Sequence, residues 1–232
     1  MSATVLDRRT AEKAECSPAA RVTRSLLGYG VIAGPLYVVA VLAQALLRPG
    51  FDLAHDDASL LSNGDFGWVQ VANFVVTGMM VIACAAGVRR ALSGGRGATW
   101  APILLAVYGA GLIGAGIFAA DPMNGFPAGA PVGRPDAIST HGILHIAFAG
   151  IGFLALVAAC TVIARRYFAE GRRGRAVFSI VTGVCFLAAF AGVASGSGSV
   201  IVIAAFWGAL ILAWAWLATL SIDLYRAAGA AR

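Results

Sequence analysis

The sequence predicts an all-α, polytopic transmembrane helix bundle with six spans and with both termini in the cytoplasm. Three observations support this fold class: the composition, the length of the apolar stretches and the placement of the basic residues. The chain has 232 residues, of which 59% are hydrophobic and only 12% are charged, whereas soluble domains carry about 25% charge. We therefore expect the protein to lie in a membrane.

Six apolar stretches are each close to the roughly 20 residues that cross about 30 Å of hydrocarbon. Because hydrocarbon offers the backbone no water, each span should be an α-helix. The expected spans are Leu26–Leu47, Trp68–Val88, Trp100–Ala120, His141–Ala164, Ala176–Ser195 and Val200–Leu220. They divide the chain into a disordered basic tail (residues 1–25), a six-helix transmembrane domain (residues 26–225) and a short cytoplasmic tail (residues 226–232).

The basic residues predict the orientation in the membrane. All of the 17 Lys and Arg residues except Arg48 and Arg134 fall in the two tails or in the connections after the second and fourth spans. The positive-inside rule places these segments in the cytoplasm. The net charge of +6 follows from this asymmetry, so we expect no nucleic-acid partner. A single Lys beside many Arg is typical of a high-GC bacterial genome, which favours a bacterial cell-membrane protein.

Small residues predict how the spans pack. Ala106, Ala110 and Gly114 form one row on the third span, and Gly111 and Ala115 form a second row beside it. Lipid supplies no hydrophobic drive between helices, so such rows mark close helix contacts. We expect the third span at the centre of the bundle, with part of its small-residue surface available for a homo-oligomer.

Polar and aromatic side chains inside the spans have ordinary structural interpretations. Gln70 and Asn73 on the second span are predicted to form interhelical hydrogen bonds. Trp207, Trp214 and Trp216 on the last span are predicted to face lipid or the core rather than to form a ligand cage.

The side chains that could bind a metal or take part in catalysis lie on the side of the membrane opposite the basic segments. The candidate site residues are His55, Asp57, Ser59, Asp121, His141 and His145. His141 and His145 are four residues apart at the start of the fourth span, which puts both imidazoles on one helix face. Asp121 is expected at the C-terminus of the third helix, the unfavourable end of the helix dipole for a carboxylate.

One interpretation of these residues is a zinc site. Zinc takes three protein ligands and leaves a position for water, whose pKa then falls to about 7. The three histidines would be the ligands, and Asp57 or Asp121 would be a fourth ligand or a base. The alternative is that the residues are interfacial polar side chains, because HxxxH without an intervening Glu is a weak motif.

Two loops on this side are expected to have structure of their own. The stretch Ala54–Ser62 could form a short helix, with Leu60 and Leu61 on its buried side. The loop Asp121–Thr140 is rich in Pro and Gly, so it should be extended and stiff, and it is long enough to act as a lid.

These loops carry a resemblance to a known family. The segments concerned are Arg48–Asp52, His55–Leu61, Gly67–Gln70, Asn73–Phe74, Asp121–Pro122, Gly125–Pro127 and His141–His145. Through them the chain resembles a bacterial membrane family known as domain of unknown function 998. The resemblance covers nearly all of the chain after the first tail. It implies six spans and distinctive outer loops, and it implies no activity.

A looser likeness is to the alkaline ceramidase and adiponectin-receptor type membrane hydrolases, which place an HxxxH, a third His, an Asp and a Ser around zinc. It implies zinc binding by His55, His141 and His145, with catalytic roles for Asp57 or Asp121 and for Ser59. This chain departs from those proteins in the number of spans and in the order of its third His and Ser. The likeness is therefore an analogy.

Three functions remain open from the sequence. The first is a metal-dependent hydrolase that acts on a lipid or another apolar substrate. The second is a membrane-embedded isoprenoid cyclase in which Asp121 or Asp57 donates the proton. The third is a non-enzymatic lipid-binding, sensing or assembly subunit. In each case the expected partners are membrane lipids or an apolar small molecule.

Overall fold

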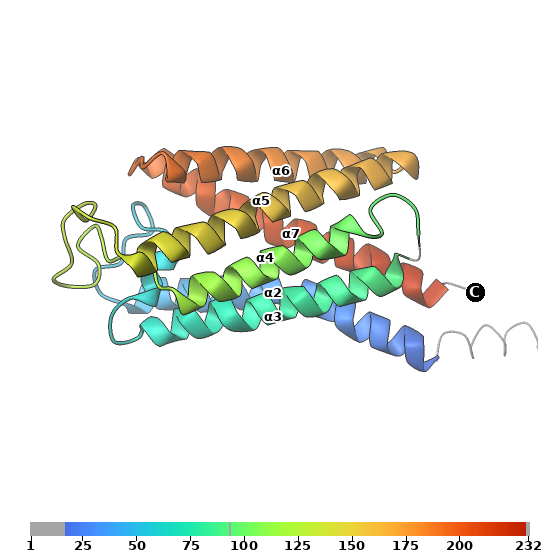
Figure 1. The fold of residues 1–232 in the computed structure, drawn as a ribbon, viewed down its shortest axis with the longest axis horizontal. Coiled ribbons are helices and arrows are strands. Elements are labelled where there is room, and N and C mark those ends of the chain that lie inside the picture. Colours follow the sequence, from blue (N-terminus) through green and yellow to red (C-terminus); the bar gives the residue numbers. More distant parts are fainter. Residues whose placement is uncertain (1–16, 93, 231–232) are drawn as a thin grey trace, which may run out of the picture.

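The computed structural model describes residues 17–92 and 94–230, and this part of the chain is all-α (Figure 1). The elements are α2 (Pro18–Leu47), the 3-10 helix η1 (Ala58–Ser62), α3 (Gly67–Ala91), α4 (Trp100–Ile117), α5 (Thr140–Ala169), α6 (Arg173–Ala194) and α7 (Val200–Ala230). The six α-helices are long and apolar enough to cross a membrane. The predicted all-α class and the six predicted spans are confirmed.

The structure differs from the prediction at the helix ends. Helix α2 begins at Pro18, where Ser17 caps it by accepting the N–H of Ala20 at 3.2 Å. Residues 18–25, expected in the disordered tail, are therefore helical, while residues 1–16 lie outside the described residues. Helix α7 likewise continues through the expected second tail to Ala230.

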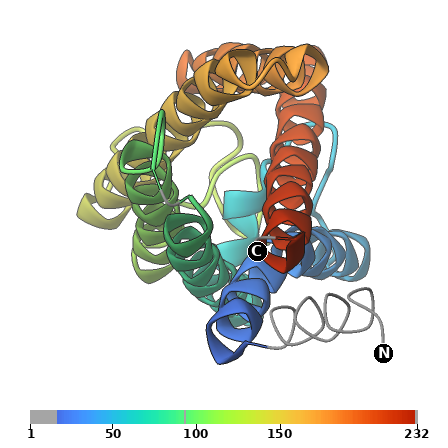
Figure 2. The same cartoon turned by 90° about the vertical axis from the view of Figure 1, so that its right-hand side faces the viewer.

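The six helices form a closed ring in chain order, with α7 returning to pack against α2 (Figure 2). The predicted central position of the third span is wrong, because α4 is one member of this ring. Its small residues face two neighbours: Gly109 lies against the backbone of Gly78 on α3, and Gly111 lies against Gly152 on α5. Ala110, between these two surfaces, is exposed.

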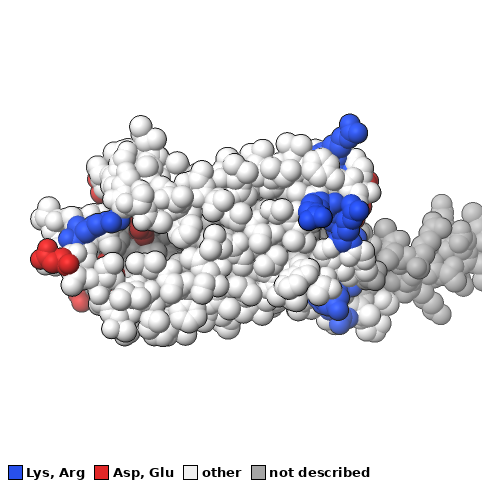
Figure 3. All heavy atoms as spheres, turned by 45° about the horizontal axis from the view of Figure 1, so that its top comes forward, with Lys and Arg blue, Asp and Glu red and all other residues white. Residues whose placement is uncertain are grey.

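The two ends of the ring differ in charge (Figure 3). We call the end with the connections 92–99 and 170–172 the basic end, and Arg side chains gather there. We call the end with the segments 48–66, 118–139 and 195–199 the loop end, and acidic side chains are prominent there. In the basic half, α3 and α7 meet inside the ring, with Cys84 Sγ 3.3 Å from Ser221 Oγ. In the loop half, the helices enclose a cavity.

Candidate functional site

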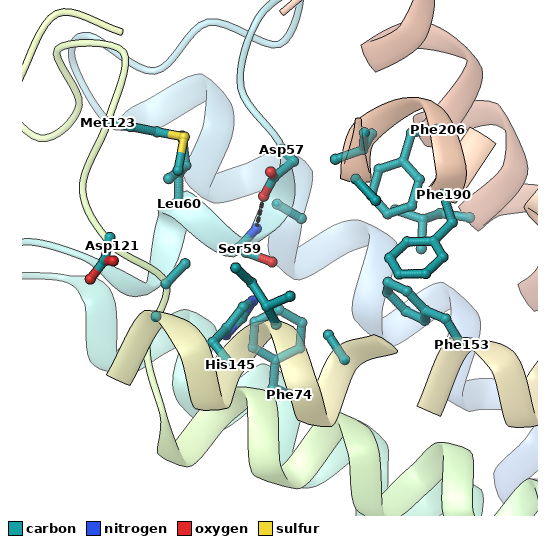
Figure 4. A pocket seen from close by; sticks show the side chains of 18 of the residues that line it. Asp57, Ser59, Leu60, Phe74, Asp121, Met123, His145, Phe153, Phe190 and Phe206 are labelled. Atoms are coloured by element: carbon teal, nitrogen blue, oxygen red, sulfur yellow. Dashed lines mark hydrogen bonds between the residues drawn. The ribbon is translucent and has the colours of Figure 1, made fainter. Parts of the chain in front are cut away.

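The loop half of the ring holds a cavity of about 520 Å³ that is lined mainly by apolar side chains (Figure 4). Each of the six α-helices contributes at least one aromatic ring to its wall. These residues are Tyr37, Phe74, Tyr108, Phe153, Phe190, Phe206 and Trp214. The volume falls within the range of about 300–1,000 Å³ that is typical of small-molecule sites.

The aromatic rings of the wall form two clusters, and within each cluster the rings contact one another. Trp214 lies 5.3 Å from Tyr37 and 6.0 Å from Tyr108, measured between ring centroids. Phe153 lies 5.2 Å from Phe190 and 6.0 Å from Phe206 with its edge toward them. Such edge-to-face pairs are favoured by the ring quadrupoles. The interior is therefore a mainly apolar surface rich in aromatic rings.

Trp214 is the cavity residue that the sequence reasoning missed. It was predicted to face lipid or the core, and it is indeed buried, with 4% exposure. It nevertheless lines the cavity, and its buried indole N–H has no hydrogen-bond partner among the described residues. The only signal in the sequence was a tryptophan at mid-span, which does not distinguish a core position from a cavity wall.

Helix η1 forms the roof of the cavity and carries two of the candidate residues. Asp57 caps η1, since its Oδ1 accepts the N–H of Ser59 at 2.8 Å, and both residues line the cavity (Figure 4). Leu60 and Leu61 are buried beneath the loop end, with 1% and 0% exposure. The predicted short helix with its two buried leucines is confirmed, although it begins at Ala58 rather than at Ala54.

His145 has a defined tautomer and lines the cavity beside Phe74 (Figure 4). Its Nδ1 lies 2.9 Å from the carbonyl oxygen of Ala115 and 2.8 Å from that of Phe118. Carbonyl oxygens only accept hydrogen bonds, so Nδ1 carries a hydrogen, and Nε2 is the ring nitrogen that accepts in the corresponding neutral tautomer. His145 thus satisfies carbonyls at the C-terminus of α4, which would otherwise lack partners.

The prediction that Asp121 ends the third helix is wrong. Helix α4 stops at Ile117, and Asp121 reaches the N-terminus of α5 instead. Its Oδ2 accepts the N–H of Ser139 at 2.8 Å, its Oδ1 accepts the Ser139 hydroxyl, and it packs over Gly142, where a Cβ would collide with it. This is the end of a helix dipole that favours a carboxylate. Asp121 therefore supports the start of α5 at the mouth of the cavity.

The three histidines are not brought together. His55 Nδ1 pairs with Asp52 Oδ2 at 2.7 Å, and both side chains are more than half exposed. His141 is exposed and packs edge-on against Phe118. Residues 17–92 and 94–230 contain no group of three or more His, Cys, Asp or Glu side chains that could hold a metal ion. The expected zinc ligand set is therefore not assembled, and the analogy to the zinc-dependent membrane hydrolases gains no support.

The predicted interhelical hydrogen bonds of Gln70 and Asn73 are confirmed. Gln44 Nε2 donates to Gln70 Oε1 at 2.9 Å, and Asn73 Nδ2 donates to the same oxygen at 3.2 Å. The first bond joins α2 to α3, as does the bond from Asn73 Nδ2 to the carbonyl oxygen of Tyr37 at 3.3 Å, and none of the three amide side chains lines the cavity.

The roof is held by residues that the sequence reasoning did not select. Asp56 is buried, with 2% exposure, and accepts the N–H of Asp52 at 2.8 Å and of Asn124 Nδ2 at 3.2 Å. Burial raises the pKa of Asp56 above its ordinary value. The Arg48 guanidinium donates to the carbonyls of Leu61 and Asn63, which fixes the end of η1. The first loop and segment 118–139 are thus one connected cover.

The fold and the cavity define a multi-pass helical bundle that encloses an aromatic chamber under a loop cover. The chain belongs to the family described as protein of unknown function (DUF998), whose sequence profile matches residues 31–223. No curated protein and no solved structure gave a significant match to the chain.

Proposed function

We propose that the protein binds an amphiphilic, lipid-like molecule, with the apolar part of the ligand inside the aromatic cavity and its polar end under η1. The observation that supports this most is the cavity itself, since all six helices direct aromatic side chains into one apolar space of about 520 Å³. Burying an apolar chain there gains roughly 25 cal/mol for each Å² removed from water.

The polar groups at the roof limit the kind of head group that fits. Asp57 lines the cavity with a carboxyl group, and the His145 tautomer directs an acceptor rather than a donor at Nε2. A ligand head group that donates hydrogen bonds, such as a hydroxyl or an ammonium group, complements both. Buried acceptors left without a donor would each cost about 1–3 kcal/mol, which disfavours a purely hydrocarbon ligand.

The binding proposal is tested by photolabelling in lipid nanodiscs. The probe is a long-chain alcohol with a diazirine on its chain, and labelled residues are mapped by mass spectrometry. We expect saturable labelling of cavity residues such as Phe153 and Phe206, which an unlabelled long-chain alcohol competes away. Ala149→Phe fills the cavity from α5 and should abolish this labelling, whereas Ala147→Phe, at an exposed position of the same helix, should not. Labelling confined to outward-facing residues would refute the proposal.

A second candidate function is proton-initiated cyclisation of an isoprenoid in the same cavity. It is favoured by the coincidence of seven aromatic rings with the Asp57 carboxyl group at the roof, since ring faces stabilise cations by about 0.5–2 kcal/mol each. The Asp57 carboxyl would protonate a terminal C=C bond, and the resulting cation would be attacked by the next C=C bond. Loss of a neighbouring proton to the Asp57 carboxylate would regenerate the acid, so the reaction is an isomerisation that needs no oxidant.

Cyclisation is tested by incubating the protein with a linear polyprenyl alcohol and analysing the products by gas chromatography. Asp57→Asn should remove cyclic product but keep binding, while Asp136→Asn, at an exposed carboxylate near the mouth, should keep both. Equal product from Asp57→Asn and from the parent protein would exclude this mechanism.

The charge distribution supports a location in the bacterial cell membrane with the basic end toward the cytoplasm. Single cysteines introduced in segment 118–139 should then react, in intact cells, with a thiol reagent that does not cross the membrane. Reaction only after cell lysis would contradict this orientation.

A further inference from the structure

Five residues that line the cavity are also exposed: Arg134 and Asp136 in segment 118–139, together with Ile138, Ile146 and Ala194. Ile146 on the early part of α5 is 57% exposed, and Ile138 just before α5 is 55% exposed. Ala194, the last residue of α6, is also exposed. A side chain that touches the cavity and the exterior together marks an opening. The opening therefore lies between the loop-end halves of α5 and α6.

The packing of α5 against α6 explains why the opening forms there. At the middle of α6 the two helices are in close contact, because a Cβ on Gly183 would lie 3.2 Å from Cys160 Cβ. Closer to the loop end the contact is looser: a Cβ on Gly150 would meet only the tip of the Phe190 ring, at 3.7 Å. Beyond this point α5 and α6 diverge (Figure 1). Figure 3 shows a hollow in the surface at the loop end, with an acidic side chain visible inside it.

The neighbouring seams between helices are closed at the same level. Phe118 and Phe148 stack across α4 and α5 at 5.5 Å, and a Cβ on Gly192 of α6 would lie 3.0 Å from Val202 of α7. Above the cavity, η1 covers the interior, and the Arg134 side chain reaches the backbone of Gly196 between α6 and α7. The opening is therefore bordered by charged Arg134 and Asp136 toward the loop end and by apolar Ile138 and Ile146 along α5.

We propose that the ligand enters and leaves sideways through the opening between α5 and α6, directly from the bilayer. This inference rests on the proposed binding of an amphiphile in the cavity, and it identifies the ligand as a membrane-resident molecule. At the opening α5 presents Ile146, which is 57% exposed and apolar, and this suits contact with acyl chains. A chain can slide between the helices while its head group moves at the loop end, where Asp57 and His145 receive it.

Ile146 and Ile143 provide a matched pair for the test. They lie one turn apart on α5 and are 57% and 56% exposed, but only Ile146 lines the cavity. Ile146→Trp should obstruct the opening, and Ile143→Trp should only add an indole to the outer surface. The readout is the rate at which cavity residues become photolabelled after nanodiscs are mixed with vesicles that contain the diazirine alcohol.

Ile146→Trp is expected to slow cavity filling by about tenfold or more, equivalent to roughly 1.4 kcal/mol of added barrier. Its final extent of labelling, after long incubation, should approach that of the parent protein, which shows that the variant is folded. Ile143→Trp should fill at the parent rate. Equal rates for the parent and Ile146→Trp, or equal slowing by both variants, would overturn the lateral route while leaving the cavity proposal intact. Absence of cavity labelling in the parent protein would overturn both.

Discussion

His145 is predicted to stabilise the C-terminus of α4 from a neighbouring helix, and Ala and Asn substitutions separate this role from any chemistry in the cavity. His145 is 5% exposed, and its single Nδ1–H serves the carbonyls of both Ala115 and Phe118. His145→Ala leaves these carbonyls without that donor. The loss is one shared donor, so we expect a decrease of about 1–3 kcal/mol in the free energy of unfolding. For a chain of this size that corresponds to a fall of roughly 2–12 °C in Tm.

The Asn variant is the control for His145→Ala. An Asn amide places an N–H near the position of Nδ1 and can bond to the same carbonyls, but it has no equivalent of Nε2. His145→Asn should therefore recover most of the lost stability while losing any function that depends on Nε2. The assay is thermal unfolding of purified protein in nanodiscs, followed by circular dichroism. The reasoning fails if His145→Ala melts with the parent protein, or if the Asn and Ala variants are equally destabilised.

Burial raises the pKa of Asp56, so the folded protein retains a proton that the unfolded chain releases. The stability contributed by this group is full below the ordinary pKa and is lost as pH rises through the raised value. Asp56→Asn should therefore flatten the decline of Tm as pH rises above about 4, and an unchanged slope would contradict the assignment. Gly111→Ala should cost about 1–3 kcal/mol, because its Cβ would meet the backbone of Gly152 at 2.7 Å. Gly208→Ala is the control, because a Cβ there meets nothing within 4 Å, and it should be neutral or up to about 1 kcal/mol stabilising. Urea or SDS unfolding of the Gly111→Ala and Gly208→Ala variants measures the difference, and equal effects would refute the packing argument. Metal analysis by mass spectrometry should give the same zinc content for the parent protein and for His141→Ala/His145→Ala, since the histidines do not converge. Stoichiometric zinc in the parent protein that is lost in the double variant would instead support the zinc-dependent hydrolase hypothesis.

The spans could be predicted from the sequence because the length and apolarity of a transmembrane helix are local properties. The position of each helix in the bundle could not. Gly111 and Gly114 make the predicted close contacts, whereas Ala110 is exposed, and a row of small residues does not reveal which neighbour it meets. In the structure Gly109 and Gly111 face opposite neighbours, which places α4 in a ring.

The histidine pair shows the same limit at the candidate site. The spacing of His141 and His145 correctly indicates one helix face, yet only His145 is buried. Helix α4 ends at Ile117, so the first turn of α5 extends beyond it, and His141 has only Phe118 as an aromatic neighbour. The aromatic cavity was not predicted either, because each helix contributes only one or two rings and no single helix carries the pattern.

The central claim, that the aromatic cavity is a ligand site, is tested most directly by the fluorescence of Trp214. In a variant that keeps Trp214 as its only tryptophan, we predict saturable quenching by a brominated long-chain alcohol, and loss of that quenching on adding Ala149→Phe. A matched variant that keeps only Trp68, which is 67% exposed on the surface, should show quenching that rises without saturation as the alcohol partitions into the bilayer. Quenching of Trp214 that is absent, or that follows the Trp68 curve, would contradict the account.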